Sequence, residues 1–229
     1  MKTRRILLFV SLAALLTAAT ASAQNDSWQG KPYQQWTKSE ATKVLENSPW
    51  AQVVAQTGPL GDTGDLKSNS EVYVVRLRSS LPVRQALLRL RQLGEKYDQM
   101  NEKKKAEFDE KNRALVECPA CADNYVLAVI PPGPADSRSL KLERTKLFVR
   151  LMDDRGRSRE LVHVIPAKAA GQEVILFFPR FDEKGEPLIT PATKKLVFTL
   201  DATVLNLGPS LRRFEFDVSK LMRDGKVDF

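Results

Sequence analysis

The sequence predicts an α+β protein whose C-terminal part is an antiparallel β-sandwich of about seven strands. Short runs rich in β-branched and aromatic residues, separated by turn residues, crowd residues 124–218, which is typical of a sandwich. A long segment with helical spacing of apolar residues lies between the first two strands, and further helices are expected near the N-terminus. The likeness to immunoglobulin domains is at most an analogy of architecture.

The first 23 residues have the features of a secretory signal peptide. Lys2, Arg4 and Arg5 precede the apolar run ILLFVSLAALL, and Ala21 and Ala23 occupy the small-residue positions of a cleavage site. The apolar run is shorter than the roughly 20 residues that cross a bilayer, and no later run is longer. We therefore expect cleavage after Ala23, export to the periplasm or the extracellular space, and no membrane span.

The composition is that of an ordinary globular protein, with 42% hydrophobic and 28% charged residues. Cleavage of the signal peptide removes three of the 36 basic residues and none of the 28 acidic ones, which lowers the net charge from +8 to about +5. Because both signs are interspersed along the chain, nucleic acid is not an expected partner. The candidate partners are an anionic component of the cell envelope and another envelope protein.

Residues 24–35 are polar with isolated aromatic residues, which predicts a poorly ordered arm that docks through Trp28 and Tyr33. The rest of the chain, residues 36–229, is predicted to be a single α+β domain. Its N-terminal half is helical and its β-rich part covers 124–218.

A capping box predicts the first helix of this domain. Thr37 precedes Glu40 by three residues, the arrangement in which each side chain caps the other's backbone, and the helix is expected to end near Asn47. The Ser-Pro pair at 48–49 has the pattern of an N-cap residue followed by proline at the first position of a new helix. We therefore expect a short second helix that carries residues 50–54.

The stretch QWTKSEATKVLENSPWAQ, residues 35–52, resembles N-terminal segments of uncharacterised secreted bacterial proteins. The shared features are a Trp-Thr start, a Glu in the first helical turn and a Ser-Pro-Trp second start. The resemblance implies an extracytoplasmic bacterial protein, and it implies no activity.

The predicted strands and helices follow in order after a Gly-rich and Asp-rich loop at 57–70. A strand over 71–78 leads into a helical segment from 81 to about 115, which Gly94 is expected to divide. Gly156 and Gly185 lie in hairpin turns that need a positive φ angle. The remaining predicted strands cover 125–130, 145–152, 159–166, 173–181, 194–204 and 211–218.

Cys118 and Cys121, the two cysteines of the chain, are expected to form a disulfide in an oxidising compartment. A structural bond that fixes a helix-to-strand turn is the favoured interpretation. Thiol-disulfide exchange is the alternative, although an active pair normally opens a helix, whose N-terminal dipole stabilises the thiolate. Zinc needs more ligands than two thiolates and His163. Ala122 stands where covalent haem attachment requires His, so no metal or cofactor is predicted.

No other pattern indicates a catalytic centre. His163 lies in an alternating strand, where an exposed or satisfied imidazole is more common than a catalytic base. The carboxylate pairs at 153–154 and 182–183 are expected at exposed hairpin tips, whereas glycoside chemistry needs a carboxylic acid in a cleft.

A cluster of arginines predicts an anion-binding patch. Arg150, Arg155, Arg157 and Arg159 surround one predicted hairpin, and Arg212 with Arg213 opens a later strand. Arginine side chains suit phosphate and carboxylate groups. The sequence thus favours an exported, soluble, non-catalytic binding or scaffolding protein of the bacterial cell envelope with no cofactor. The alternative is a thiol-disulfide oxidoreductase or redox-responsive protein that uses Cys118 and Cys121.

Overall fold

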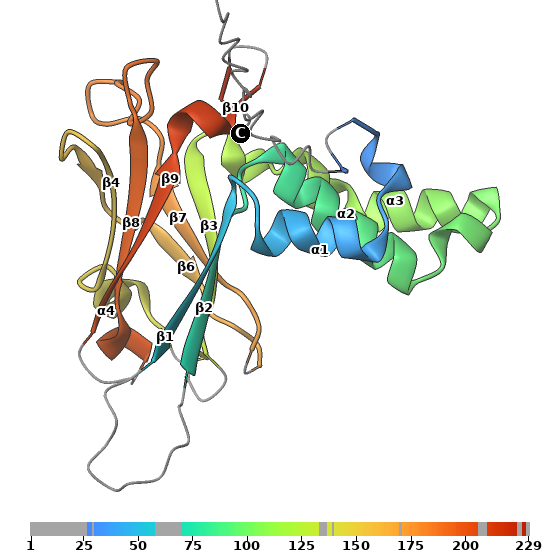
Figure 1. Ribbon diagram of the computed structural model, residues 1–229, viewed down its shortest axis with the longest axis horizontal. Coiled ribbons are helices and arrows are strands. Elements are labelled where there is room, and N and C mark those ends of the chain that lie inside the picture. The colour runs from blue at the N-terminus through green and yellow to red at the C-terminus, as the bar shows by residue number, and fades with distance from the viewer. Residues whose placement is uncertain are drawn as a thin grey trace, which may run out of the picture.

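The structure is a computed structural model that describes residues 27–28, 30–57, 70–132, 137–138, 140–169, 171–205, 210–223 and 226–227. Two antiparallel sheets face each other, and helices stand to one side of them (Figure 1). The chain is therefore an α+β protein with a β-sandwich, as the sequence predicts.

The larger sheet has the strand order β1-β2-β3-β7-β6, and the smaller sheet has the order β5-β4-β8-β9. Every pairing is antiparallel. The strands of the larger sheet are β1 (Ala51–Thr57), β2 (Ser70–Leu77), β3 (Asn124–Ile130), β7 (Val174–Pro179) and β6 (His163–Ile165). Those of the smaller sheet are β5 (Ser158–Arg159), β4 (Val149–Asp153), β8 (Lys195–Asp201) and β9 (Leu211–Asp217). A separate pair joins β10 (Met222–Arg223) to β11 (Lys226–Val227).

Alternating side chains of both sheets fill the space between them. Phe178 of β7 meets Phe198 of β8 edge to face at 6.2 Å, and Phe198 stacks on Phe214 of β9 at 5.9 Å. All three rings are fully buried. Burial of each such side chain stabilises the fold by about 1.5–3 kcal/mol, so this row of rings is a main source of cohesion between the sheets.

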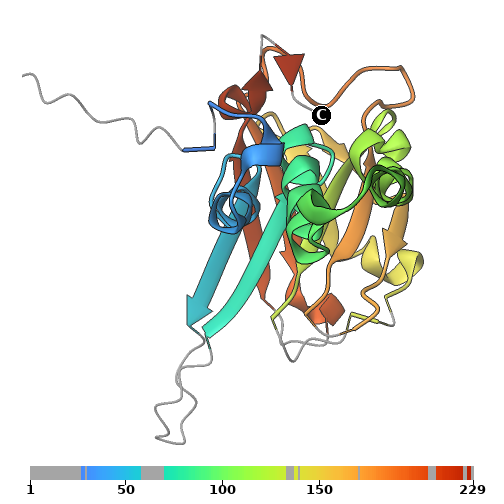
Figure 2. The same ribbon diagram turned by 90° about the vertical axis from the view of Figure 1, so that its right-hand side faces the viewer.

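The longer helices are α1 (Lys38–Glu46), α2 (Leu81–Gly94) and α3 (Glu102–Glu117), and α4 (Leu142–Thr145) is a single turn. Both views show α1, α2 and α3 together on one side of the sandwich (Figures 1 and 2). The capping box of α1 is present, because Thr37 and Glu40 cap each other's backbone N–H groups. Five 3-10 turns complete the described structure: η1 (Tyr33–Gln35), η2 (Tyr97–Gln99), η3 (Pro119–Cys121), η4 (Ala202–Leu205) and η5 (Val218–Leu221).

A network of charges joins the helices to the outer face of the larger sheet. Arg76 of β2 is 7% exposed, and its Nε donates a hydrogen bond of 2.7 Å to the carbonyl oxygen of Leu45 in α1. The carboxylate of Glu173 accepts from Arg76 at 2.7 Å and from Arg78 at 2.5 Å. One carboxylate thus holds two guanidinium groups, and one of them fixes the C-terminal end of α1.

The predicted division of the long helical segment is confirmed. Gly94 is the last residue of α2, and the reversal in backbone direction follows at Lys96, whose φ of 57° lies in the left-handed region. The side chain of Asn101 accepts a hydrogen bond from the Lys104 N–H and so begins α3. Only Phe108 and Asn112 of α3 are buried, so this helix stands largely in water.

The predicted second helix after Asn47 is wrong, because residues 51–57 form β1. The Ser48 hydroxyl donates to the carbonyl of Val44 at 2.6 Å and accepts from the Trp50 N–H at 3.3 Å, so Ser48 ends α1 instead of starting a helix. The β-branched pair at 53–54 then pairs with β2, and this tertiary pairing overrides the local helix signal.

The single strand predicted over 159–166 is also wrong. It divides into β5 of the smaller sheet and β6 of the larger one, with residues 160–162 crossing between them. The predicted strand over 145–152 begins only at Val149, after the turn of α4. The predicted positive φ angles are confirmed at Gly156 and Gly185, which lie at 82° and 78°.

Several sequence predictions fall outside the described residues. These are the signal peptide at 1–23, residues 24–26 and 29 of the arm, positions 58–69 of the loop and Pro134. In the part of the chain that is described, no helix is both long and apolar enough to cross a membrane.

We expect Lys96→Gly to raise the free energy of unfolding by about 0.5–1 kcal/mol, because glycine adopts the left-handed conformation without the steric cost of a Cβ atom. Lys103→Gly, a matched change at an exposed position within α3, should lower it by about 1 kcal/mol. Urea unfolding followed by circular dichroism measures both. A loss of stability in Lys96→Gly equal to that in Lys103→Gly would contradict the expectation.

Candidate functional site

A cleft of about 520 Å³ lies where the N-terminal segment, the turn between α1 and β1, the start of α2, and the C-terminal elements η5 and β10 meet. We call it the tryptophan cleft, because all three tryptophans of the chain belong to its wall. The wall consists of Trp28, Tyr33, Trp36 and Trp50, the prolines Pro32, Pro49 and Pro82, and the side chains of Lys31, Gln34, Gln85, Lys220 and Met222.

The three tryptophans pack edge to face. The ring of Trp28 lies 5.8 Å from that of Trp36 and 5.6 Å from that of Trp50, with interplanar angles of 75° and 64°. All three are buried, and Tyr33 lies half-buried beside Trp36. Trp28 is therefore docked in the core, the contact that the sequence predicts for the N-terminal arm.

Trp36 holds the N-terminal segment in place. Its Nε1 donates to the carbonyl oxygens of Trp28 at 3.1 Å and Lys31 at 3.2 Å. The carbonyl of Trp36 in turn accepts from Arg89 Nε of α2 at 3.0 Å. Because these bonds are buried and connect segments far apart in sequence, they fix one wall of the cleft firmly.

Two buried donors of the cleft wall have no acceptor among the described residues. They are the indole N–H groups of Trp28 and Trp50, whose residues are only 5% and 7% exposed. Buried polar groups in proteins are almost always hydrogen-bonded, and an unmade bond costs about 1–3 kcal/mol. Both nitrogen atoms are inaccessible to solvent, so a molecule in the cleft does not reach them in this arrangement of the side chains.

The charges of the cleft wall are positive, since it includes two lysines and no acidic residue. Lys31 pairs with Glu40 at 2.7 Å, and its hydrogen bond is the largest of the effects that lower the pKa of Glu40 to about 2. Lys220 is 3.9 Å from Asp217, and the side chains of both are well exposed, so this pair is weak. Lys220 is therefore the cation that an entering anion can approach most easily.

Cys118 and Cys121 form the expected disulfide. Cys118 follows the last residue of α3 in the left-handed region, its N–H donates to Ala114 of the last turn, and Cys121 lies in η3 just before β3. The pair thus leaves a helix and enters a sheet, as predicted. At this end the helix dipole disfavours a thiolate.

A shallow groove of about 200 Å³ passes the disulfide. Cys118 is part of its wall and Cys121 is not. Ile165, Ile175 and Phe177 of the larger sheet provide much of its apolar surface. One sulfur-bearing residue therefore borders an apolar groove, which is the feature that thiol-disulfide exchange with an unfolded chain would need.

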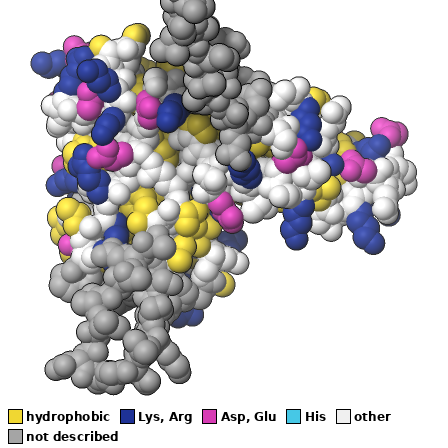
Figure 3. All heavy atoms as spheres, in the orientation of Figure 1, with side chains coloured by type: hydrophobic (Ala, Val, Ile, Leu, Met, Phe, Trp, Pro, Cys, Tyr) yellow, Lys and Arg dark blue, Asp and Glu magenta, His cyan; other side chains and the backbone are white. Residues whose placement is uncertain are grey.

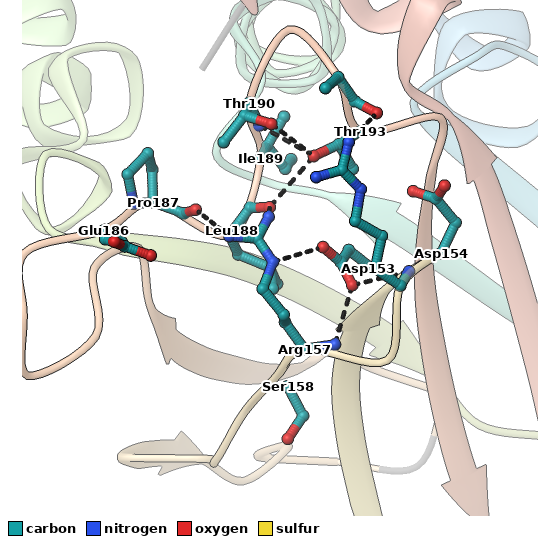
Figure 4. A network of polar contacts seen from close by, with 12 residues as sticks. Asp153, Asp154, Arg157, Ser158, Glu186, Pro187, Leu188, Ile189, Thr190 and Thr193 are labelled. Atoms are coloured by element: carbon teal, nitrogen blue, oxygen red, sulfur yellow. Dashed lines mark hydrogen bonds and ion pairs between the residues drawn. The ribbon is translucent and has the colours of Figure 1, made fainter.

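Most arginines of the predicted patch make hydrogen bonds or ion pairs within the protein. Asp153 was expected at an exposed hairpin tip, and this was wrong, because its side chain is fully buried. Its carboxylate accepts from the backbone N–H groups of Arg155 and Arg157, both at 2.9 Å, and from Arg157 Nε at 2.8 Å (Figure 4). The Arg157 guanidinium also donates to the carbonyls of Pro187 at 3.3 Å and Leu188 at 2.8 Å.

The other arginines divide into buried and exposed members. Arg159 is buried and donates to the carbonyl of Glu186 at 2.7 Å, and Arg155 donates to the carbonyl of Ala192 at 3.1 Å. Arg212 points into the sandwich and lies over the Tyr73 ring, at 5.3 Å from its centroid.

Arg150 and Arg213 are exposed and share a row on the outer face of the smaller sheet, one on each side of Thr199. Anion binding by the predicted four residues stays a prediction. The contacts favour Arg150 with Arg213 as its surface.

His163 is exposed on the edge strand β6, where it lies 5.2 Å from the Phe177 ring. No cluster of three or more His, Cys, Asp or Glu side chains able to hold a metal occurs within the described ranges.

The tryptophan cleft was not predicted from the sequence. Its wall combines residues 28–50 with residues 82–85 and 220–222, which no local pattern connects. The available signal was the confinement of all three tryptophans to residues 28–50.

We expect Arg157→Ala to lower the free energy of unfolding by about 3 kcal/mol, because it leaves the buried Asp153 carboxylate without its charged partner. Arg150→Ala is the matched control. It should change stability by no more than about 0.5 kcal/mol, since Arg150 is exposed and lies 3.7 Å from its partner Glu160. Denaturant unfolding of both variants tests this, and equal losses would show that the Asp153–Arg157 contact is not stabilising.

Comparison with protein-family models, curated proteins and solved structures found no match for this chain. The similarity of residues 35–52 to secreted bacterial proteins stays a prediction. What the cleft can bind therefore follows from its own residues.

Proposed function

We propose that the protein is an exported, non-catalytic binding protein of the bacterial cell envelope, and that the tryptophan cleft holds its ligand. The observation that carries this proposal is a cleft of about 520 Å³ whose wall is formed by aromatic residues and prolines and includes two lysines. Binding pockets typically have this volume and combine an apolar wall with a few polar groups. Export rests on the N-terminal sequence pattern.

The shape of the aromatic wall favours an extended peptide as the ligand. Trp28, Trp36 and Trp50 pack their rings edge to face against one another and are almost wholly buried, so they leave no broad ring face open for a flat ligand. Ring edges and three prolines remain, which form the kind of groove that extended proline-containing segments bind.

The charge of the cleft wall restricts the chemical class of the proposed ligand further. With two lysines and no acidic residue, the cleft favours a segment that carries a carboxylate. The proposed ligand is therefore an extended, proline-containing or aromatic, acidic segment of another envelope protein.

Selection of a random peptide library displayed on phage against the protein tests the proposal. Enriched peptides should carry proline or aromatic residues together with an acidic residue, and their binding should shift the tryptophan fluorescence. Lys220→Glu should weaken binding about tenfold, because it places a like charge at the rim of the cleft. Fluorescence anisotropy with labelled peptides measures the dissociation constants.

Lys103→Glu is the matched control, because Lys103 is an exposed lysine of α3 that does not belong to the cleft wall. This variant should bind the selected peptides like the wild type. The absence of enriched peptides, or an equal loss in both variants, would contradict binding at the cleft.

The groove beside Cys118 supports a second candidate, a thiol-disulfide oxidoreductase that exchanges Cys118 with a dithiol or disulfide of another protein. The binding interpretation expects no reduction of insulin by the protein in the presence of dithiothreitol. It also expects Cys118→Ser only to lower stability, by about 2 kcal/mol at most, since the disulfide closes a short loop. Insulin reduction that Cys118→Ser abolishes would establish the enzyme instead.

A further inference from the structure

Two exposed leucines lie at the end of the sandwich where β4 and β9 begin. Leu147 and Leu211 are each 69% exposed, the highest values among the large hydrophobic side chains that the structure describes. The Asp201 N–H donates to the carbonyl of Phe148 at 2.8 Å, and Asp201 lies opposite Leu211 in the pairing of β8 with β9. The chain at Leu147 and the start of β9 are thus separated only by β8, a distance of about 10 Å.

A segment rich in basic residues forms the same end of the sandwich. Residues 138–150 include five basic residues and one acidic residue. Within this segment α4 packs on the core, since Thr145 is only 1% exposed, and the one acidic residue, Glu143, pairs with Lys146 at 2.6 Å. Leu147 is therefore surrounded in the chain by an excess of positive charge. The basic residues are Arg138, Lys141, Arg144, Lys146 and Arg150.

Two arginines follow the apolar residues at the same spacing on two strands. On the outer face of the smaller sheet, Arg213 comes two residues after Leu211, and Arg150 comes two residues after Phe148. Because a strand rises about 3.3 Å per residue, each arginine lies about 7 Å behind the apolar residue of its strand. Basic side chains lie on the smaller sheet at the left of Figure 3, with hydrophobic side chains below them.

The acidic groups near these two arginines hold them only weakly. Arg213 lies 2.7 Å from Glu215, and Arg150 lies 3.7 Å from Glu160. The side chains of all four are at least 36% exposed, and exposed ion pairs contribute little. Asp201 accepts a hydrogen bond of 2.9 Å from a backbone N–H two residues further on. Both guanidinium groups can therefore bind an external anion.

We propose that this end of the sandwich docks on a membrane surface that contains anionic phospholipids. Leu147 and Leu211 enter the lipid, and Arg150 and Arg213 lie at the level of the phosphates. Proteins that lie on membranes bury apolar side chains about 5–10 Å into the boundary between headgroups and acyl chains, which matches the spacing on both strands. The basic segment adds attraction to the anionic surface.

A lipid surface suits this end better than another protein does. The two leucines project from the molecule, and neither belongs to the wall of the tryptophan cleft or of the groove beside Cys118. A protein partner would need a hollow for each projecting side chain, whereas acyl chains adapt to their shape. Positive charge directly beside projecting apolar side chains is the pattern that an anionic bilayer surface complements.

Docking in this way would hold the tryptophan cleft away from the lipid. Strand β9 runs from Leu211 at the docking end to Asp217, about 20 Å further along. It continues into η5, whose Lys220 belongs to the cleft wall. Figure 1 shows β9 rising from the end that holds α4 toward β10.

Sedimentation with lipid vesicles tests the proposal. The wild type should pellet with vesicles of phosphatidylcholine and phosphatidylglycerol and remain in solution with phosphatidylcholine alone. The double variant Leu147→Ser and Leu211→Ser should bind at least about tenfold more weakly, because it loses the apolar groups that enter the lipid. Arg150→Gln and Arg213→Gln should each weaken binding about fivefold. Circular dichroism checks that the variants remain folded.

Two control variants separate docking at this end from general stickiness or charge. Phe181→Ser removes a residue that is 47% exposed and follows the last strand residue of β7, at the opposite end of the sandwich. Lys103→Gln with Lys104→Gln removes two exposed charges of α3. Both controls should bind like the wild type. The proposal is overturned by equal losses in the controls, by equal binding to both kinds of vesicle, or by binding to heparin without binding to vesicles.

A fluorescent label tests the orientation. Both natural cysteines are joined in the Cys118–Cys121 disulfide, so Leu211→Cys introduces the single free thiol for a polarity-sensitive dye. Vesicles that contain phosphatidylglycerol should shift the emission of this label to the blue. The same label on Lys220→Cys, at the cleft, should not respond. An equal shift at both positions, or none at Leu211→Cys, would refute docking through this end.

Discussion

The ion pairs of the Glu173 carboxylate with Arg76 and Arg78 are the contacts on which the arrangement of helices and sheet depends. The carboxylate binds Arg76 of β2 and Arg78, which directly follows β2, and Arg76 also donates to the Leu45 carbonyl in the last turn of α1. Without this carboxylate the two guanidinium groups would repel each other, and the buried Arg76 guanidinium would have no charged partner. By fixing α1 against β2, the network also fixes Trp50, which follows α1, and with it one wall of the tryptophan cleft.

Much of the fold could be predicted from the sequence, because the relevant signals are local. Alternating apolar residues, the Thr37–Glu40 capping box and glycines at positive φ each act over a few residues. The failures have a common cause in tertiary contacts. β1 was not predicted, because its pairing with β2 outweighs the local Ser-Pro helix signal. Residues 159–166 were predicted as one strand, because a run of mixed polarity contains no local signal for a crossing from one sheet to the other.

For the candidate sites, too, only features that depend on neighbouring residues in the chain could be predicted. The order helix, disulfide, strand could be predicted, since it depends on residues that follow one another in the chain. The burial of Asp153 could not be predicted, because it depends on a distant part of the chain. Arg157, the partner of Asp153, donates to the carbonyls of Pro187 and Leu188. Four nearby arginines look like a surface patch in sequence. In the structure, Arg155, Arg157 and Arg159 donate to backbone carbonyls of their own chain, and only Arg150 does not.

The cleft unites residues near both ends of the chain, Trp28 at one side and Met222 at the other. These two sides of the cleft are far apart in the sequence, so the first must wait for the second before the cleft can form. Contacts of such large separation form late. A ligand of the kind we propose would accordingly bind only to molecules in which both parts of the chain have folded together.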